Sequence, residues 1–317
     1  MKTCASLRPQ IAELQITRLQ MPMNGVIVID KPAGLTSHDV VNRVRRILGQ
    51  RSVGHLGTLD PSATGVLPIV VGNLTRLAQF YAHSEKRYEG VIRFGFATDT
   101  YDADGEPTTP SRDIHLSYDE VRALAAKFHG KIMQTPPPFS AKKIAGVPAY
   151  KLARKNKEVA LKQVEVEIKE FEILGTTSDE AAFRARVASG TYIRSIAHEM
   201  GERLGCGAYL ASLRRTAAAE FMIEDAHSLA ALQDAMQQGT IESLFVHPRK
   251  LVPQLPCVSA TEENATLIRS GRSVNLPEMS KSPQVKVFYG QRDLIAIATR
   301  IAGTLFHPGI VFPSSAA

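Results

Sequence analysis

The sequence contains few cysteines and no long run of apolar residues. Its three cysteines, Cys4, Cys206 and Cys257, are too few and too widely spaced for a disulfide framework or a zinc cluster. The best apolar stretch, Val66–Val71, is interrupted by a proline and is much shorter than the roughly 18 residues that a membrane span requires. No apolar run follows the basic residues near the start of the sequence, so no secretory signal is predicted. We expect a protein of a reducing, cytoplasmic compartment that does not enter a membrane.

The sequence also lacks the common loops that bind nucleotides and metals. It has neither a G-x-x-x-x-G-K-[ST] phosphate loop nor a glycine-rich dinucleotide fingerprint. Asp102–Gly105 resembles the middle of a calcium loop, but Thr100 and Ser111 occupy its first and twelfth ligand positions, so the segment is interpreted as a turn. His198 and Glu199 match the start of a zinc-protease motif, but Glu202 occupies the position of the second histidine. We therefore expect no metal and no nucleotide cofactor.

What the sequence does have is an ordinary globular composition with a basic excess. Its 317 residues suggest one large domain with a smaller one, or two comparable ones, at roughly 100–200 residues per domain. Hydrophobic residues make up 44% and charged residues 22%, which argues against wholesale disorder and against a coiled-coil rod. A net charge of +7 and a pI of about 9.3 favour a polyanionic partner only mildly.

Most of the excess charge lies in one segment, 141–162. This segment carries seven Lys or Arg residues against one Glu, a local excess of six, and includes Lys142, Lys143 and Lys151. It could be a solvated loop. Basic residues around an exposed aromatic such as Tyr150 also suit a flexible arm that touches a phosphate backbone. The sequence alone leaves both interpretations open.

Hydrophobic periodicity predicts interleaved strands and helices. The predicted strands are 26–29, 88–96, 164–173, 183–187, 285–289 and 294–299, and the predicted helices are 37–48, 119–129, 193–204 and 228–238. The alternation in 164–173 slips phase at Lys169–Glu170, which predicts a β-bulge. Because the elements do not follow a regular βαβ rhythm, we expect an α+β fold rather than a doubly wound sheet. We place a domain boundary at the proline-marked stretch 248–256.

The densest cluster of conformationally special residues is 54–68. It contains three glycines, two prolines and a single carboxylate, Asp60. Because Asp60 precedes Pro61 and lies among glycines, its backbone is constrained. A constrained loop suits a nucleophilic or basic carboxylate that must be held at a reacting atom. An ordinary Asp-Pro turn is the alternative interpretation.

Two further places combine aromatic and charged residues. Tyr192 and Arg194 follow a Ser-Gly turn at the start of a predicted helix and straddle the apolar Ile193. The arginine could pin a carboxylate and the tyrosine could cap an apolar pocket, or they could be a packed tyrosine and a surface arginine. Lys86–Tyr88 sets an aromatic beside charges at the start of a strand, which suits stacking on a nucleobase.

Five separated segments occur in the order found in one known family. They are Gly25–Gly34, Gly54–Leu67, Lys86–Tyr88, Thr98–Gly105, and Gly190–Arg194 continuing to Leu213–Arg215. Together they closely resemble the bacterial tRNA pseudouridine synthase B (TruB) family.

The resemblance runs from Asn24 to about Arg249 and implies the pseudouridine synthase fold: a mixed, largely antiparallel sheet flanked by helices. On this basis the catalytic domain is expected at 24–250, with a basic thumb insertion at about 141–162. The tail, 258–317, looks like a small β-rich, PUA-like RNA-binding domain. The leader, 1–23, lies outside the resemblance.

The resemblance implies an isomerase that converts uridine to pseudouridine at position 55 in the T loop of tRNA. The family flips the base out and then cleaves and re-forms the glycosidic bond, with no cofactor and no metal. Asp60 matches the catalytic aspartate, Tyr192 the tyrosine proposed to take the proton from carbon 5, and Arg194 the arginine that pairs with the aspartate. Whether the aspartate attacks the sugar or assists loss of the proton at its carbon 2 stays open.

The resemblance also implies residues that bind the substrate. Tyr88 matches the aromatic that stacks on the flipped uracil, and His55 the histidine that occupies the gap left by the flipped nucleotide. Lys31 matches a lysine near the pocket, and Leu213 an apolar wall. The basic segment 141–162, with its lysines at 142, 143 and 151, matches the thumb that grips the RNA backbone.

The expected partner is the T stem-loop of tRNA, bound by a monomer that requires no protein partner. An archaeal-type, guide-RNA-dependent synthase would need protein partners, and the long thumb and slight tail favour the stand-alone bacterial form. The main alternative is a non-catalytic RNA-binding or tRNA-folding module on the same fold. The constrained Asp60 argues against that alternative, because a pure binder has no use for a carboxylate facing a polyanion.

Overall fold

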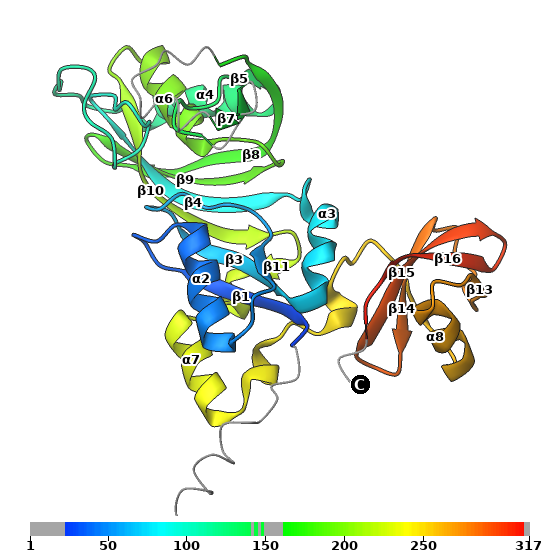
Figure 1. Ribbon diagram of the computed structural model, residues 1–317. Coiled ribbons are helices and arrows are strands. Elements are labelled where there is room, and N and C mark those ends of the chain that lie inside the picture. Colours follow the sequence, from blue (N-terminus) through cyan, green and yellow to red (C-terminus); the bar gives the residue numbers. More distant parts are fainter. Residues whose placement is uncertain (1–22, 141–142, 145–146, 149–160, 314–317) are drawn as a thin grey trace, which may run out of the picture.

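The computed structural model describes residues 23–140, 143–144, 147–148 and 161–313 (Figure 1). These residues form a nine-stranded sheet with helices around it, a five-stranded sheet with one helix, and a small two-stranded pair. The predicted leader, except for Met23, and most of the basic segment 141–162 lie outside the described residues.

The large sheet is mixed and largely antiparallel, as expected of this fold class. Its strands are β1 (Gly25–Lys31), β2 (Val53–His55), β3 (Thr64–Val71), β4 (Lys86–Phe94), β5 (Gly130–Gln134), β8 (Val164–Thr176), β9 (Glu180–Val187), β10 (Ala208–Ala218) and β11 (Phe221–Met222). The order is β1-β3-β10-β4-β9-β8-β5, with β2 beside β3 and β11 beside β10. Among these pairs only β3 and β10 run parallel, so the α+β prediction is confirmed.

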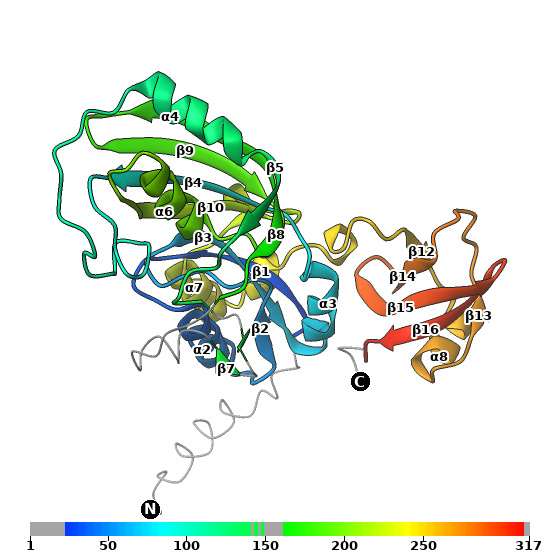
Figure 2. The same ribbon diagram turned by 90° about the horizontal axis from the view of Figure 1, so that it is seen from above.

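The helices divide between the two halves of this sheet. They are α2 (Ser37–Leu48), α3 (Ala78–Tyr81), α4 (Tyr118–Ala125), α6 (Ile193–Arg203) and α7 (Leu229–Gln238), with short 3-10 helices η1 (Gly72–Leu77), η2 (Ala126–Phe128), η3 (Ile223–Asp225), η4 (Ile241–Leu244) and η5 (Pro248–Lys250). Helices α4 and α6 pack near β8 and β10, whereas α2 and α7 contact each other beside β1 and β2 (Figures 1 and 2). Among the described residues no helix is long and apolar enough to cross a membrane.

Local sequence signals account for several of these elements. Thr36 caps α2 through a capping box with Asp39, and Gly49 ends the helix in the left-handed conformation, so the predicted helix is confirmed. The predicted bulge in β8 is also present: Ile168 pairs with Val187 of β9, but the register has shifted at the next pair, Glu170 with Arg186.

The first strand shows how the core is built. Ile27 and Ile29 point into the main apolar cluster, which the helices cover, while Val26 and Val28 point into a second cluster on the other face. Because side chains alternate across a strand, a strand covered on both faces is a continuous apolar run.

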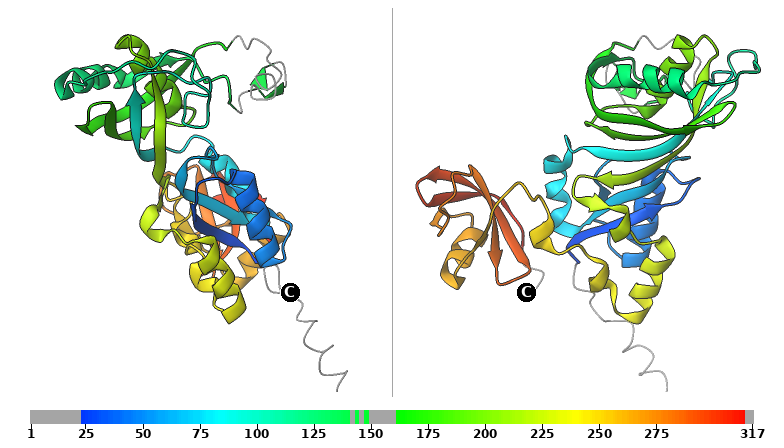
Figure 3. Two further views of the ribbon diagram at one scale, coloured as in Figure 1. Left: turned by 90° about the vertical axis from the view of Figure 1, so that its left-hand side faces the viewer. Right: turned by 180° about the vertical axis from the view of Figure 1, so that it is seen from behind.

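The smaller sheet contains β12 (Cys257–Ser259), β13 (Val274–Asn275), β14 (Gln284–Tyr289), β15 (Asp293–Ala302) and β16 (Leu305–Val311), in the order β12-β14-β15-β16-β13, with helix α8 (Glu262–Arg269). It stands beside the large sheet near α3 (Figures 1 and 3). The two parts share an apolar cluster in which Phe288, Leu294 and Phe312 join Val28 and Leu251.

The sequence pattern predicts neither α8 nor β10. Helix α8 buries only Ala265 and Ile268, too few apolar positions to mark a helix. Strand β10 has register shifts at Leu210/Ser212 and Arg215/Ala217, which break the alternation that marks a half-buried strand. Strand β10 lies inside the sheet, between β3 and β4, and yet shows no regular alternation.

Gly65 marks the tightest approach between strands. At its φ of +100°, a Cβ would lie 2.2 Å from the carbonyl oxygen of Arg215 on the neighbouring β10. We expect Gly65→Ala to lower the free energy of unfolding by about 3 kcal/mol, because neither backbone can move away. Denaturant unfolding measures this loss. Gly175→Ala in β8 is the control: a Cβ there meets nothing within 4 Å, and its effect should stay within about 1 kcal/mol. Equal stability of the two variants would contradict the prediction.

Candidate active site

Asp60 lies on the loop that joins β2 to β3, and hydrogen bonds to its neighbours hold the backbone of this loop. The Leu59 amide donates to the buried Ser37 hydroxyl at 2.8 Å, and that hydroxyl donates to the Leu59 carbonyl at 3.0 Å. The Ala63 amide donates to the Asp60 carbonyl at 3.2 Å. The Asp60 side chain itself is 39% exposed, so a rigid backbone presents an accessible carboxylate.

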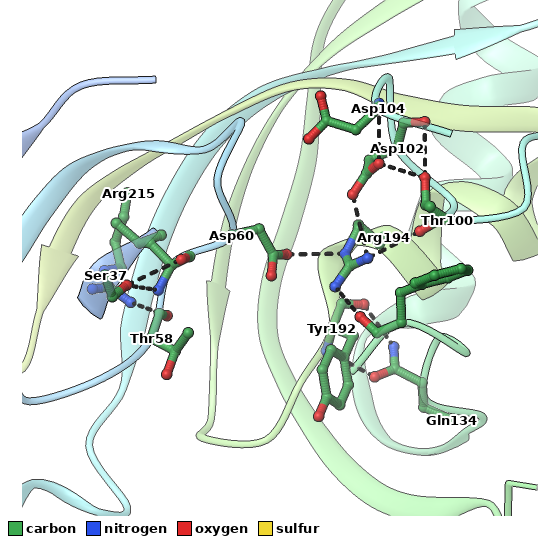
Figure 4. Close-up of polar contacts among 12 residues, drawn as sticks. Ser37, Thr58, Asp60, Thr100, Asp102, Asp104, Gln134, Tyr192, Arg194 and Arg215 are labelled. Atoms are coloured by element: carbon green, nitrogen blue, oxygen red, sulfur yellow. Dashed lines mark hydrogen bonds and ion pairs between the residues drawn. The ribbon is translucent and has the colours of Figure 1, made fainter. Parts of the chain in front are cut away.

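Arg194, at the start of α6, pairs with two carboxylates. Its Nε lies 2.9 Å from Oδ2 of Asp60, and its Nη1 lies 3.3 Å from Oδ2 of Asp102 (Figure 4). The arginine is 6% exposed, so the interpretation of a surface arginine is wrong. Its guanidinium also donates to the carbonyls of Thr100 and Phe139, each at 3.0 Å. One buried cation thus joins four separate segments of the chain.

Asp102 is buried and oriented by its own loop. The Thr100 hydroxyl donates to Asp102 Oδ1 at 2.6 Å, and the Asp104 amide donates to the same oxygen at 3.2 Å. Burial raises the pKa of Asp102, against the opposing effects of the Thr100 hydrogen bond and the Arg194 charge. The segment predicted to be a plain turn therefore supplies the second partner of Arg194.

Tyr192 is held at the N-terminal end of the same helix. Its amide donates to Oε1 of Gln134 at 2.8 Å, and Nε2 of Gln134 donates to its carbonyl at 3.0 Å. Gln134 is fully buried, so the Tyr192 backbone has little freedom. Burial raises the pKa of the Tyr192 phenol, which therefore stays protonated at neutral pH.

A pocket brings several of the predicted site residues together. It is lined by Asp60, Ser62, Ala63, Asp102, Arg194 and 210–213. Of the residues predicted from the sequence, Asp60, Arg194 and Leu213 line it. Charged groups and the apolar Leu213 thus line one pocket.

The lining of this pocket does not include Tyr192, Tyr88, His55 or Lys31. Tyr88 is 8% exposed and belongs to the main apolar cluster. His55 Nδ1 accepts from the Gly57 amide at 3.3 Å, and burial lowers the pKa of His55. The Lys31 ammonium donates to the carbonyls of Pro32, Leu35 and Pro61, at 3.0, 2.7 and 3.0 Å. Burial lowers the pKa of Lys31 to about 8, although the charge of Asp60 opposes this.

The predicted phosphate-binding lysines cannot be placed. Lys142 and Lys151 lie outside the described residues, and of Lys143 only the backbone, in the short strand β6 (Lys143–Ile144), is described. Strand β6 pairs with β7 (Val147–Pro148).

Sequence reasoning missed two residues that organise the site. Asp102 was interpreted as part of a turn, and Arg215 was included only in a segment that carries the resemblance, so neither residue was given a role. Arg215 is in fact 1% exposed, and it donates to the carbonyl of Gly57 at a sequence separation of 158 residues. A local pattern carries no signal for contacts at such a separation.

Comparisons with known proteins find relatives over most of the chain. A family model described as "TruB family pseudouridylate synthase (N terminal domain)" matches residues 45–193, and one described as "tRNA pseudouridylate synthase B C-terminal domain" matches residues 194–252. The chain is 46% identical over 292 residues to "tRNA pseudouridine synthase B" of Solibacter usitatus (strain Ellin6076), covering 91% of this chain and 100% of that protein. It is 43% identical over 249 residues to the protein of the same name in Geobacter sulfurreducens, covering 78% of this chain and 82% of that one.

A solved structure supports the fold. The archaeal box H/ACA sRNP Nop10-Cbf5 complex contains a chain that superimposes with a TM-score of 0.67 at 26% identity, covering 92% of this chain and 87% of that one. The identity to full-length relatives is high enough to establish the family as well as the fold. The chain belongs to the TruB family of tRNA pseudouridine synthases, which are isomerases.

Proposed function

We propose that this synthase isomerises the uridine at position 55 in the T loop of tRNA, with Asp60 as its catalytic carboxylate. The observation that carries the proposal is the exposed carboxylate of Asp60 against the buried Arg194, in a pocket with Leu213 as an apolar wall. The reaction is a rearrangement within one nucleotide. It breaks the bond from uracil nitrogen 1 to the ribose and makes one from carbon 5. Carbon 5 loses a proton and nitrogen 1 gains one, so the product is an isomer and no redox partner or group donor is needed.

The first step needs a carboxylate held at the ribose. Asp60 either attacks the sugar or takes the proton at its carbon 2, and both roles need a fixed, ionised oxygen. Arg194 stabilises that oxygen through the ion pair at 2.9 Å. The guanidinium is itself fixed by Asp102 and two carbonyls, so it does not have to reorganise during the reaction.

The last step needs an acceptor for the proton on carbon 5. Tyr192 opens the helix that carries Arg194, and burial keeps its phenol protonated. A neutral phenol accepts that proton on its oxygen only if it releases its own to water, so Tyr192 acts as a relay rather than as a preformed base.

The substrate base must leave its stack to reach this pocket. Extrusion costs a few kcal/mol, and stacking on Tyr88 offsets part of that cost. In this proposal His55 occupies the gap that the flipped nucleotide leaves. The segment 141–162 would grip the phosphate backbone, and the PUA-like tail would add a second RNA contact. In this proposal the protein acts in the cytoplasm as a monomer without a protein partner.

Asp60→Asn tests the central assignment. Asparagine keeps the size and the hydrogen-bonding capacity but removes the charge and the nucleophile. We expect turnover on an unmodified tRNA transcript to fall by about three orders of magnitude or more, with tRNA affinity within about tenfold, or 1.4 kcal/mol. The measurement is incubation followed by mapping of pseudouridine, expected at position 55 for the wild type. Turnover retained in Asp60→Asn would remove the assignment, and wild type that binds tRNA without product would favour the non-catalytic module.

Tyr192→Phe tests the proton relay. The phenylalanine keeps the ring and its packing, so the melting temperature should not change. Product formation in a single turnover should be nearly abolished, because the variant lacks the hydroxyl that relays the carbon 5 proton. Binding of tRNA should survive. Near-normal turnover would make Tyr192 a wall of the pocket and assign proton removal to water or to Asp60.

Asp102→Asn tests the second partner of Arg194. Without the Asp102 charge, the guanidinium has only Asp60 as a carboxylate partner and should shift toward it, drawing that carboxylate away from the ribose. We expect turnover to fall by about one to two orders of magnitude, with unchanged tRNA affinity. Asp104→Asn is the matched control, since Asp104 lies exposed on the same loop and contributes only its amide. Equal activity of the two variants would contradict a role for the Asp102 charge.

A further inference from the structure

The loop that carries Asp60 is held by side-chain donors on its backbone carbonyls, and the largest of these donors is Arg215. Its Nη2 donates to the Gly57 carbonyl at 3.0 Å, its Nη1 to the Thr58 carbonyl at 3.1 Å, and its Nε to the Val66 carbonyl at 2.7 Å. One planar guanidinium therefore ties both arms of the loop together. Figure 4 shows Arg215 on one side of Asp60, opposite Arg194.

Arg215 is costly to bury, which implies that its charge has a use. It is 1% exposed, and none of the ion pairs among the described residues involves it. An arginine cannot lose its proton in a protein, and a buried charge without a counter-charge destabilises a fold. At a buried position of β10, an apolar side chain would avoid the free energy of removing a charge from water. The carbonyls of the Asp60 loop are what this guanidinium contacts instead.

The backbone of Arg215 is held between two neighbouring strands. In β10, Arg215 pairs with Gly65 of β3 on one side and with Tyr88 of β4 on the other. The approach to Gly65 is so close that no Cβ fits between them. Because the backbone of Arg215 is held in the sheet, the hydrogen bonds of its guanidinium restrict the movement of the loop carbonyls that accept them.

We propose that Arg215 is a positioning residue for the isomerisation: it holds the carbonyls of Gly57 and Thr58 so that Asp60, two residues further on, stays at reacting distance from the ribose. Arg215 does not touch the substrate. The Ser37 hydroxyl and the Lys31 ammonium hold the next carbonyls, those of Leu59 and Pro61, and complete the same restraint. The proposal rests on the proposed role of Asp60.

Two variants of Arg215 and one matched control test this. Arg215→Lys keeps the charge but loses the fork that reaches three carbonyls, and Arg215→Met loses both. The control is Lys286→Met in β14: Lys286 is also 1% exposed and donates to the carbonyls of Arg249 and Leu251, at 2.9 and 2.6 Å. It is a buried cation that holds backbone carbonyls far from the pocket. The full-length proteins are compared for melting temperature, tRNA dissociation constant and single-turnover rate.

If Arg215 positions Asp60, both Arg215 variants should lose about 30- to 100-fold in single-turnover rate, the loss that a misplacement of about 1 Å causes. Their tRNA dissociation constants should stay within about threefold. Lys286→Met should have a lower melting temperature but the wild-type single-turnover rate. The effect on Arg215→Lys is decisive if Arg215→Met does not fold.

Two results would overturn the inference. One is an Arg215→Lys rate within about threefold of the wild type. The other is a rate loss in Lys286→Met that equals the loss in the Arg215 variants, since Arg215 would then be a structural residue only. A failure of the proposed function is seen separately, as wild type that forms no pseudouridine or Asp60→Asn that remains active.

Discussion

The arrangement of the pocket depends on the ion pair between Asp60 and the buried guanidinium of Arg194. Arg194 is 6% exposed, so its charge must be balanced within the protein. Asp60 and Asp102 provide that balance from two loops, and the carbonyls of Thr100 and Phe139 take the remaining donors. Because all of these groups converge on one cation, a displacement of any of the four segments would disturb the others.

The two carboxylates beside Arg194 differ in their exposure, and this difference separates their roles. The Asp102 side chain is 9% exposed and accepts hydrogen bonds from Thr100 and Asp104, so it is occupied within the protein. The Asp60 side chain is 39% exposed. Asp60 is therefore the more accessible of the two carboxylates, as its proposed role at the ribose requires, while Asp102 fixes the guanidinium that Asp60 faces. A single arginine between an occupied and an accessible carboxylate is a way to keep a reactive group both exposed and oriented.

Sequence reasoning was most successful where the signals are local. The helix at 37–48, the bulge in β8 and the constrained loop around Asp60 each depend on residues within a few positions of one another. It failed for β10, because its two register shifts disrupt the alternation of apolar residues. It also failed for Asp102 and Arg215, because Asp102 pairs with Arg194 of a distant helix and Arg215 reaches the Gly57 carbonyl at a sequence separation of 158. Their burial is a property of the fold and not of their neighbours in the chain.

The cations on the two sides of Asp60 act on different atoms. Arg194 pairs with the carboxylate, whereas Arg215 and Lys31 donate to carbonyls of the loop backbone. The backbone donors restrict where the loop can lie, and the ion pair restricts where the side chain can point. Neither restraint is sufficient alone, since a fixed side chain on a mobile loop would drift with it. The site reaches its precision by combining contacts that are separated widely in sequence, on a sheet in which β10, between β3 and β4, supplies Arg215.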